Sequence, residues 1–209
     1  MISLMRAASD FDQIASNIAI WQGYDSTVKA ELYSTCLATS DGTYFIDPIP
    51  LQSKPLDQLI GPRPLAGIVV TNCNHHRAAG KFAENSSAPI FGRCETFQHK
   101  PPQFRNLADG DEISKGLRAI FIEGAADGEI ALHYAPDGGT FIIGDALINF
   151  EPYGFTFLPA KYCCNQRQLQ RSLRKLLAYN AERMLFAHGT PIGSGASERL
   201  RDLLESPHG

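Results

Sequence analysis

Hydrophobic and polar residues alternate over short stretches in the first part of the chain, and this pattern predicts strands. Residues 13–22 contain the alternating run Ile18-Ala19-Ile20-Trp21, which is typical of a strand with one buried face. Two further runs, 31–37 and 43–47, flank the dipeptide Asp41-Gly42. Asp-Gly between two such runs indicates a hairpin, because the turn needs residues that accept positive φ. The chain therefore begins with antiparallel β-structure.

The rest of the chain mixes strands with helices. Apolar runs predict further strands at 67–70, 88–92, 117–122, 130–134 and 140–143. Helices are expected at 56–60, at 78–84, after Asn165, and around residues 200–204. The third of these has leucines on one face at 169, 173, 176 and 177 and begins with Asn165 as its N-cap. Residues 99–106 are expected to form a loop. This order predicts two sheets with helices outside.

Composition narrows the class of protein. A chain of 209 residues suits one domain, 1–209, and 44% hydrophobic content is ordinary for a globular protein. The net charge of −3 does not indicate a nucleic acid partner, and no apolar run approaches the ~18 residues of a membrane span. The start lacks a secretory pattern, and five cysteines are an odd number without framework spacing. We therefore expect reduced thiols, a cytoplasmic location and no membrane partner.

Three polar turns each follow an apolar run and carry the candidate chemistry. They are Thr71–Gly80 after 67–70, Gly144-Asp145 after 141–143, and His188-Gly189 after 184–187. Ligands in α/β proteins bind at the carboxyl ends of strands, so residues in such turns can meet. The three turns together predict a single site.

Taken in order, these turns resemble the motifs of the metallo-β-lactamase superfamily. The resemblance extends over residues 31–193. Residues 71–80 fall on its motif Thr-His-x-His-x-Asp-His, Ile143–Leu147 on its Gly-Asp strand end, and Ala187–Pro191 on its final His-Gly turn. The resemblance implies an α+β fold, a four-layer αββα sandwich.

The same resemblance implies that most metal ligands have been replaced. In the superfamily, two motif histidines and a later histidine hold one zinc ion. The motif's Asp, its last His and the final His hold a second ion, and the strand-end Asp bridges the two. The positions carried over are Asn72, Asn74 and Ala125 for the first ion, His76, Arg77 and His188 for the second, and Asp145 for the bridge. Amides are poor zinc ligands, alanine offers none, and arginine keeps its proton. We therefore expect a degenerate site, with no metal cofactor.

Three hypotheses follow for the function. The first is a binding or regulatory protein whose polar pocket takes a small anionic or polar molecule. Its chemical centre would be His76, Asp145 and His188, with ligand contacts from Asn72, Asn74, His75 and Arg77. In this account Arg77 pairs with Asp145 and replaces the charge of the missing metals, while His75 faces solvent or starts the helix. A homodimer is left open.

The second hypothesis keeps a metal. His76, Asp145 and His188 would hold one zinc, iron or manganese ion and hydrolyse a carbonyl or phosphoryl substrate. The third hypothesis is a metal-free acid–base enzyme that uses His76 or His188, since an imidazole titrates near neutral pH.

Overall fold

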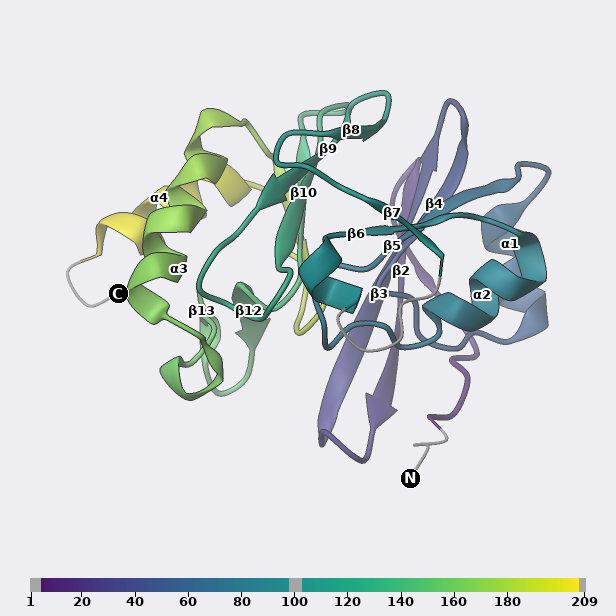
Figure 1. Ribbon diagram of the computed structural model, residues 1–209, viewed down its shortest axis with the longest axis horizontal. Helices are drawn as coiled ribbons and strands as arrows, with labels where there is room; N and C mark the ends of the chain where they lie inside the picture. Colours follow the sequence, from purple (N-terminus) through teal and green to yellow (C-terminus); the bar gives the residue numbers. More distant parts are fainter. Residues whose placement is uncertain (1–4, 98–102, 207–209) are drawn as a thin grey trace.

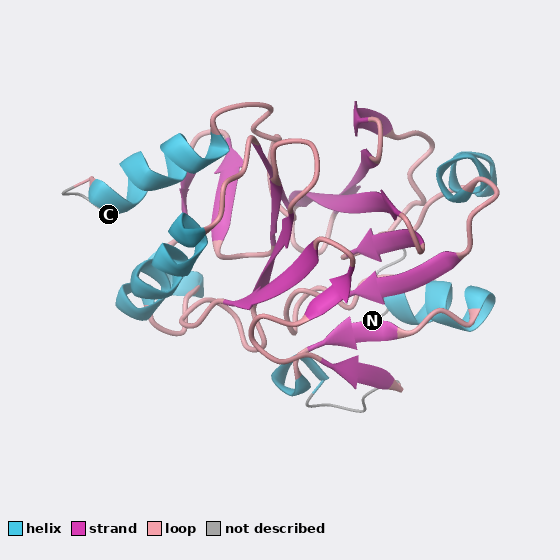
Figure 2. Ribbon diagram, turned by 90° about the horizontal axis from the view of Figure 1, so that it is seen from above, coloured by secondary structure: helices cyan, strands magenta, loops and turns pink. Residues whose placement is uncertain are grey.

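The computed structural model describes residues 5–97 and 103–206. Two β-sheets face each other, with helices on both outer sides (Figures 1 and 2). The predicted αββα sandwich is therefore confirmed. No helix among the described residues is long and apolar enough to cross a membrane. The five cysteines are all free thiols, as expected.

The first sheet has seven strands in chain order. They are β1 (Asp12–Ala15), β2 (Ile18–Asp25), β3 (Ala30–Thr39), β4 (Gly42–Ile46), β5 (Leu65–Val69), β6 (Ile90–Gly92) and β7 (Phe104–Asn106). Strands β1 to β4 pair antiparallel, as the Asp41-Gly42 turn predicts, whereas β4 to β7 pair in parallel. The loop predicted at 99–106 lies partly outside the described residues. Its last three residues form β7 instead, because their backbone pairs with β6.

The second sheet has the strand order β14-β11-β10-β9-β8. Its strands are β8 (Glu112–Ser114), β9 (Leu117–Phe121), β10 (Ile130–Tyr134), β11 (Thr140–Ile143) and β14 (Arg183–Phe186). A separate hairpin, β12 (Leu147–Phe150) and β13 (Gly154–Phe157), was not predicted. Strand β14 pairs with β11 in parallel, so both carboxyl ends meet at one edge.

The helices cover the two outer faces. Helices α1 (Ser53–Ile60) and α2 (Ala79–Ser86) cover the first sheet, and α3 (Gln166–Leu173) and α4 (Ala196–Glu205) lie beyond the second (Figure 1). Helix α3 begins as predicted, because the Asn165 side chain accepts a hydrogen bond from the Gln168 backbone N–H.

Buried apolar residues form three clusters, one for each interface of a four-layer structure. The middle cluster joins residues of both sheets, such as Leu37, Val69, Leu132 and Leu185. The outer clusters join the first sheet to α1 and α2, and the second sheet to α3 and α4. Burial of this apolar surface holds the sandwich together and fixes where the strand ends lie.

Candidate functional site

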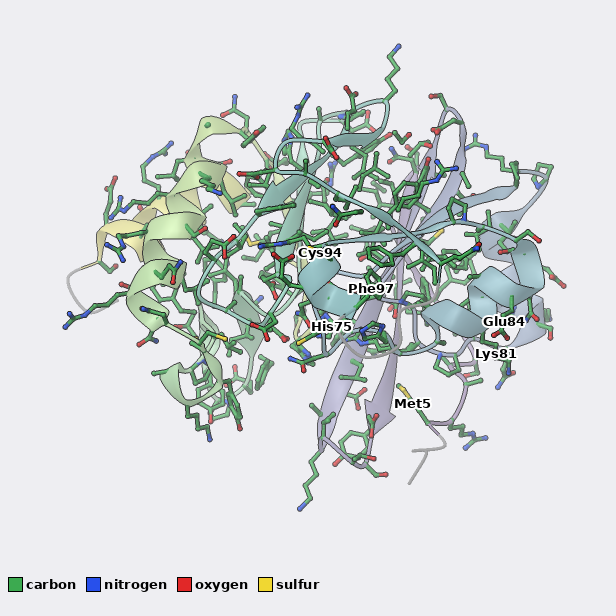
Figure 3. The ribbon with its side chains drawn as sticks, viewed as in Figure 1. Met5, His75, Lys81, Glu84, Cys94 and Phe97 are labelled. Carbon is green, nitrogen blue, oxygen red and sulfur yellow. The ribbon has the colours of Figure 1, made fainter. Side chains whose placement is uncertain are left out.

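Polar residues that follow four strands meet at one edge of the sandwich. Asp47 comes directly after β4. Thr71, Asp145 and His188 follow β5, β11 and β14, each with one residue in between. The turn after β5 adds His75, which is labelled near the centre of Figure 3, between the second sheet on the left and helix α2 on the right. The three polar turns therefore form a single site, as the sequence predicted.

Three side-chain atoms of this site form a compact triangle. His75 Nε2 and His188 Nε2 lie 3.2 Å and 3.3 Å from Asp145 Oδ1, and the two nitrogens are 3.4 Å apart. Among the described residues, these three form the one group of histidine, cysteine and acidic side chains whose ligand atoms lie close enough together to hold a metal ion. The side chain of His75 is 3% exposed and that of His188 is 20% exposed. The triangle is therefore closed behind His75 and open beside His188.

The far nitrogen of His75 is fixed by Asp47. His75 Nδ1 lies 2.8 Å from Asp47 Oδ2, which also accepts a hydrogen bond from Thr71 Oγ1 at 2.5 Å. The second oxygen, Oδ1, accepts the backbone N–H of Thr71 at 2.8 Å. A carboxylate at Nδ1 holds the proton there and leaves the Nε2 lone pair for the triangle.

The charges of the neighbours decide how His75 titrates without a metal. Burial alone lowers the pKa of His75, but the carboxylates of Asp145 and Asp47 outweigh it and raise this pKa to about 9. For the pKa of Asp145, burial and the charged neighbours act with the opposite signs. Burial raises its pKa, but His75 and His188 hold the pKa well below the ordinary value. Burial lowers the pKa of His188.

The second oxygen of Asp145 is held by amides. Asp145 Oδ2 accepts hydrogen bonds from Asn72 Nδ2 at 3.1 Å and Asn74 Nδ2 at 3.3 Å. Asn72 Nδ2 also donates to Glu129 Oε2 at 2.7 Å. Burial and the charge of Asp145 raise the pKa of Glu129 to about 8. Gly144 makes room for this packing, since a Cβ there would lie 2.6 Å from Thr71 Oγ1 and 2.7 Å from Glu129 Oε1.

Arg77 does not pair with Asp145, so that prediction is wrong. Its Nη1 donates to the backbone carbonyls of Tyr33 at 2.6 Å and Asp47 at 3.0 Å. The first partner of Asp145 is instead His75. Arg77 therefore supports the site from behind, through backbone that leads to Asp47.

His76 turns away from the triangle. Its Nε2 lies 2.8 Å from the Thr96 carbonyl oxygen, and its ring packs edge-on against Phe97 with centroids 5.0 Å apart. The structure therefore brings His75, and not His76, to Asp145 and His188. The expectation that His75 faces solvent is wrong as well, because this residue is 2% exposed.

The residues present do not fit a two-metal centre. At the position of the first metal ion, the side-chain amides of Asn72 and Asn74 donate hydrogen bonds to carboxylates. The third residue there, Ala125, is buried and has no side-chain atom that could bind a metal ion. They do fit one metal ion. Two imidazoles and one carboxylate are a common donor set for a zinc or iron site with an open position. Ligand atoms about 2.0–2.1 Å from a tetrahedral zinc ion are about 3.3–3.4 Å apart, close to the edges of the triangle.

Two residues of the site, Asp47 and Glu129, were missed by sequence reasoning. Asp47 had a usable signal, because it follows the apolar run Phe45-Ile46 as Asp145 follows 141–143. Glu129 precedes β10 after Gly128 and has no comparable pattern. Its role depends on contacts with Asn72 and Asp145, far away in the sequence.

Comparison with known proteins identifies the family of the chain. Residues 14–206 match the family model of the metallo-beta-lactamase superfamily, and the chain belongs to that superfamily. No curated protein sequence matches the chain.

Solved structures show the same fold. The DIM-1 metallo-beta-lactamase is 14% identical with a TM-score of 0.75, and the match covers 96% of this chain and 98% of that one. A metallo-beta-lactamase family protein from Thermus thermophilus is 18% identical with a TM-score of 0.67, covering 92% of this chain and 79% of that one. The metallo-beta-lactamase FIM-1 from Pseudomonas aeruginosa, in its mono-zinc form, is 12% identical with a TM-score of 0.70, covering 96% of each chain. At these identities the likeness shows the fold alone.

Proposed function

We propose that this chain is a hydrolase with a single metal ion, held by His75, Asp145 and His188. The proposal keeps the one-metal hypothesis from the sequence and replaces His76 by His75. One observation carries it, namely the nearly equal edges of 3.2, 3.3 and 3.4 Å between the three ligand atoms. The ion would be zinc, iron or manganese, and the substrate a small molecule with a carbonyl or phosphoryl group.

The distances favour an ion over hydrogen bonds alone. Charge-assisted N–H···O bonds are about 2.7–2.9 Å long. The contacts of His75 Nδ1 with Asp47 and of Asn72 with Glu129 have such lengths, 2.8 and 2.7 Å. The three contacts of the triangle are all longer. Their common length is explained if the three atoms face one central ion.

The residues around the three ligand atoms have separate roles in this proposal. Asp47 holds the His75 tautomer that offers Nε2, and Asn72 holds the outer oxygen of Asp145. When bound, such an ion acts as a Lewis acid and makes water a better nucleophile near neutral pH. The exposed edge of His188 is the side from which a substrate would approach.

The second candidate is the first hypothesis from the sequence, a metal-free binding protein, and one observation favours it. With its pKa raised to about 9, His75 carries protons on both ring nitrogens at neutral pH in the absence of a metal, and is therefore positively charged. This positive charge would lie between Asp47 and Asp145 and would satisfy both carboxylates. The site would then bind a small polar or anionic molecule without hydrolysing it.

Elemental analysis separates the two candidates. Protein purified without chelators is expected to hold about one metal ion per chain. The ion is expected to be lost in His75→Ala and in His188→Ala but kept in His76→Ala, the neighbouring histidine that contacts Thr96. Wild-type protein that stays metal-free after incubation with zinc, iron(II) and manganese(II) would overturn the proposal and leave the metal-free candidate.

A further inference from the structure

Glu129 lies behind the metal-ligand triangle and connects two of its supports. The residue is 1% exposed. Its Oε1 accepts the backbone N–H groups of Asp145 at 2.8 Å and Ala146 at 3.1 Å. Its Oε2 accepts a hydrogen bond from Asn72 Nδ2 at 2.7 Å. One buried carboxyl group therefore ties the strand end that carries Asp145 to the turn that carries Asn72.

The Asn72 amide continues this connection to the Asp145 side chain. The nitrogen that donates to Glu129 Oε2 also lies 3.1 Å from Asp145 Oδ2. An amide nitrogen has two hydrogens, so it can donate one to each carboxyl group. Asn72 Oδ1 accepts the backbone N–H of Asn74 at 2.9 Å, which fixes which end of the amide faces the acids. The amide therefore occupies one oxygen of each carboxyl group, and a cation that used either oxygen would have to displace it.

We infer that Glu129 is a positioning residue that acts through Asn72. It holds Asp145 as a ligand with Oδ1 only, and it closes the site to a second metal ion. The inference rests on the proposed one-metal function. Without the amide bridge, Asp145 Oδ2 would keep only the longer bond from Asn74 Nδ2, 3.3 Å, and the carboxylate could turn away from the triangle or offer both oxygens to the ion.

The substitution Glu129→Gln tests this role with little change of volume. A glutamine oxygen can still accept the backbone N–H groups of Asp145 and Ala146. Its NH2 group, however, would then face the Asn72 NH2 group across 2.7 Å, so two donors would meet. Asn72 has to move away from Asp145 Oδ2 as a result. Loss of a residue that orients a metal ligand typically costs about 10–100-fold in metal affinity.

The experiment measures zinc affinity by competition with a coloured chelator, together with the visible spectrum of the cobalt(II)-substituted protein. Glu129→Gln is expected to lower zinc affinity by about 10–100-fold and to change the cobalt spectrum. Asn72→Ala removes the bridge from its other end and should act in the same direction, which keeps the test valid if one variant does not fold. The control is Ile130→Val. This neighbouring core residue makes none of these side-chain contacts, so the change lowers stability but leaves affinity and spectrum unchanged.

The outcomes are distinguishable. Wild-type protein that takes about one zinc ion in excess zinc, with weaker binding and altered cobalt spectra in both bridge variants, supports the inference. Wild-type affinity and spectrum in both variants would overturn the inference and leave the proposed function intact. Two zinc ions in the wild-type protein would refute the closed second position. A wild-type protein that takes no metal would overturn the proposed function and this inference together.

Discussion

Replacing Asp47 with asparagine tests whether the His75 imidazole is held with Nε2 free. Asp47 accepts three hydrogen bonds, two at Oδ2 from His75 Nδ1 and Thr71 Oγ1 and one at Oδ1 from the Thr71 backbone. Asp47 has a φ of 48°, a left-handed conformation in which asparagine is tolerated as well as aspartate. The change therefore alters donors and acceptors while keeping the backbone.

Either orientation of the new amide breaks a contact. If the amide nitrogen takes the place of Oδ2, it faces His75 Nδ1, and the imidazole must move its proton to Nε2. If the nitrogen takes the place of Oδ1, it faces the Thr71 backbone N–H, and two donors meet. The first orientation removes the lone pair that would bind the ion. We expect metal affinity to fall by about 10–100-fold, or about 1.4–2.7 kcal/mol.

Competition with a coloured chelator measures this difference directly. The matched control is Asp41→Asn, at a carboxylate that also accepts several side-chain hydrogen bonds, from Thr39 and Tyr44 among others, in the β3–β4 hairpin. Asp41→Asn is expected to change stability but not metal affinity. If Asp47→Asn binds zinc as tightly as the wild-type protein does, Asp47 does not orient His75, and the reasoning on the tautomer is refuted.

Three further predictions concern neighbouring groups. His76→Ala should keep zinc affinity within about twofold and lower the free energy of unfolding by about 1–2 kcal/mol, since the bond to the Thr96 carbonyl and the ring contact with Phe97 are lost; a large loss of zinc affinity would return His76 to the site. Arg77→Ala should lower the free energy of unfolding in urea by about 3 kcal/mol, because two backbone carbonyls lose a charged donor; an effect below about 0.5 kcal/mol would make Arg77 an ordinary surface residue. In chelator-treated protein the free energy of unfolding should fall as the pH rises from about 7 to about 10. The pKa values of His75 and Glu129 are raised to about 9 and about 8, so the folded state holds both protons more tightly than the unfolded chain. Both contributions are complete below the ordinary pKa values and are lost as the pH passes through the raised ones, so a flat profile in urea unfolding between these limits contradicts the shifts.

The strands and the layer order could be predicted from the sequence because they depend on local pattern. The alternating runs and the Asp41-Gly42 turn predict β3 and β4 correctly. Asp145 and His188 were found for a similar reason, since each follows an apolar run that ends at the same sheet edge. Strand β7 and the β12–β13 hairpin lack a strong pattern, and they form where pairing partners are available.

The choice between His75 and His76 could not be made from spacing. The two residues are adjacent in a tight turn, in which the His75 N–H bonds to the Asn72 carbonyl and Arg77 has a φ of 39°. In such a turn, neighbouring side chains point in different directions, and long-range contacts decide which one points inward. The contact with Asp47, 28 residues away, holds His75 inside the site. The contact with the Thr96 carbonyl, 20 residues away, holds His76 outside it. The resemblance in motif placed His76 at a ligand position, but it carried no information about these partners.

The arginine next to the site does not by itself exclude a metal ion, because the surrounding acids can balance both. Arg77 contributes one positive charge, and a divalent ion would contribute two. The carboxyl groups of Asp47, Glu129 and Asp145 can supply three negative charges within the same buried network. A bound cation favours the ionised form of a neighbouring carboxyl group, so it would counteract the rise in the pKa of Glu129. In the absence of an ion, a second proton on His75 supplies one positive charge in its place. Asp47 and Glu129, the two acids that sequence reasoning missed, are therefore the residues that would allow a cation and an arginine to share this edge of the sandwich.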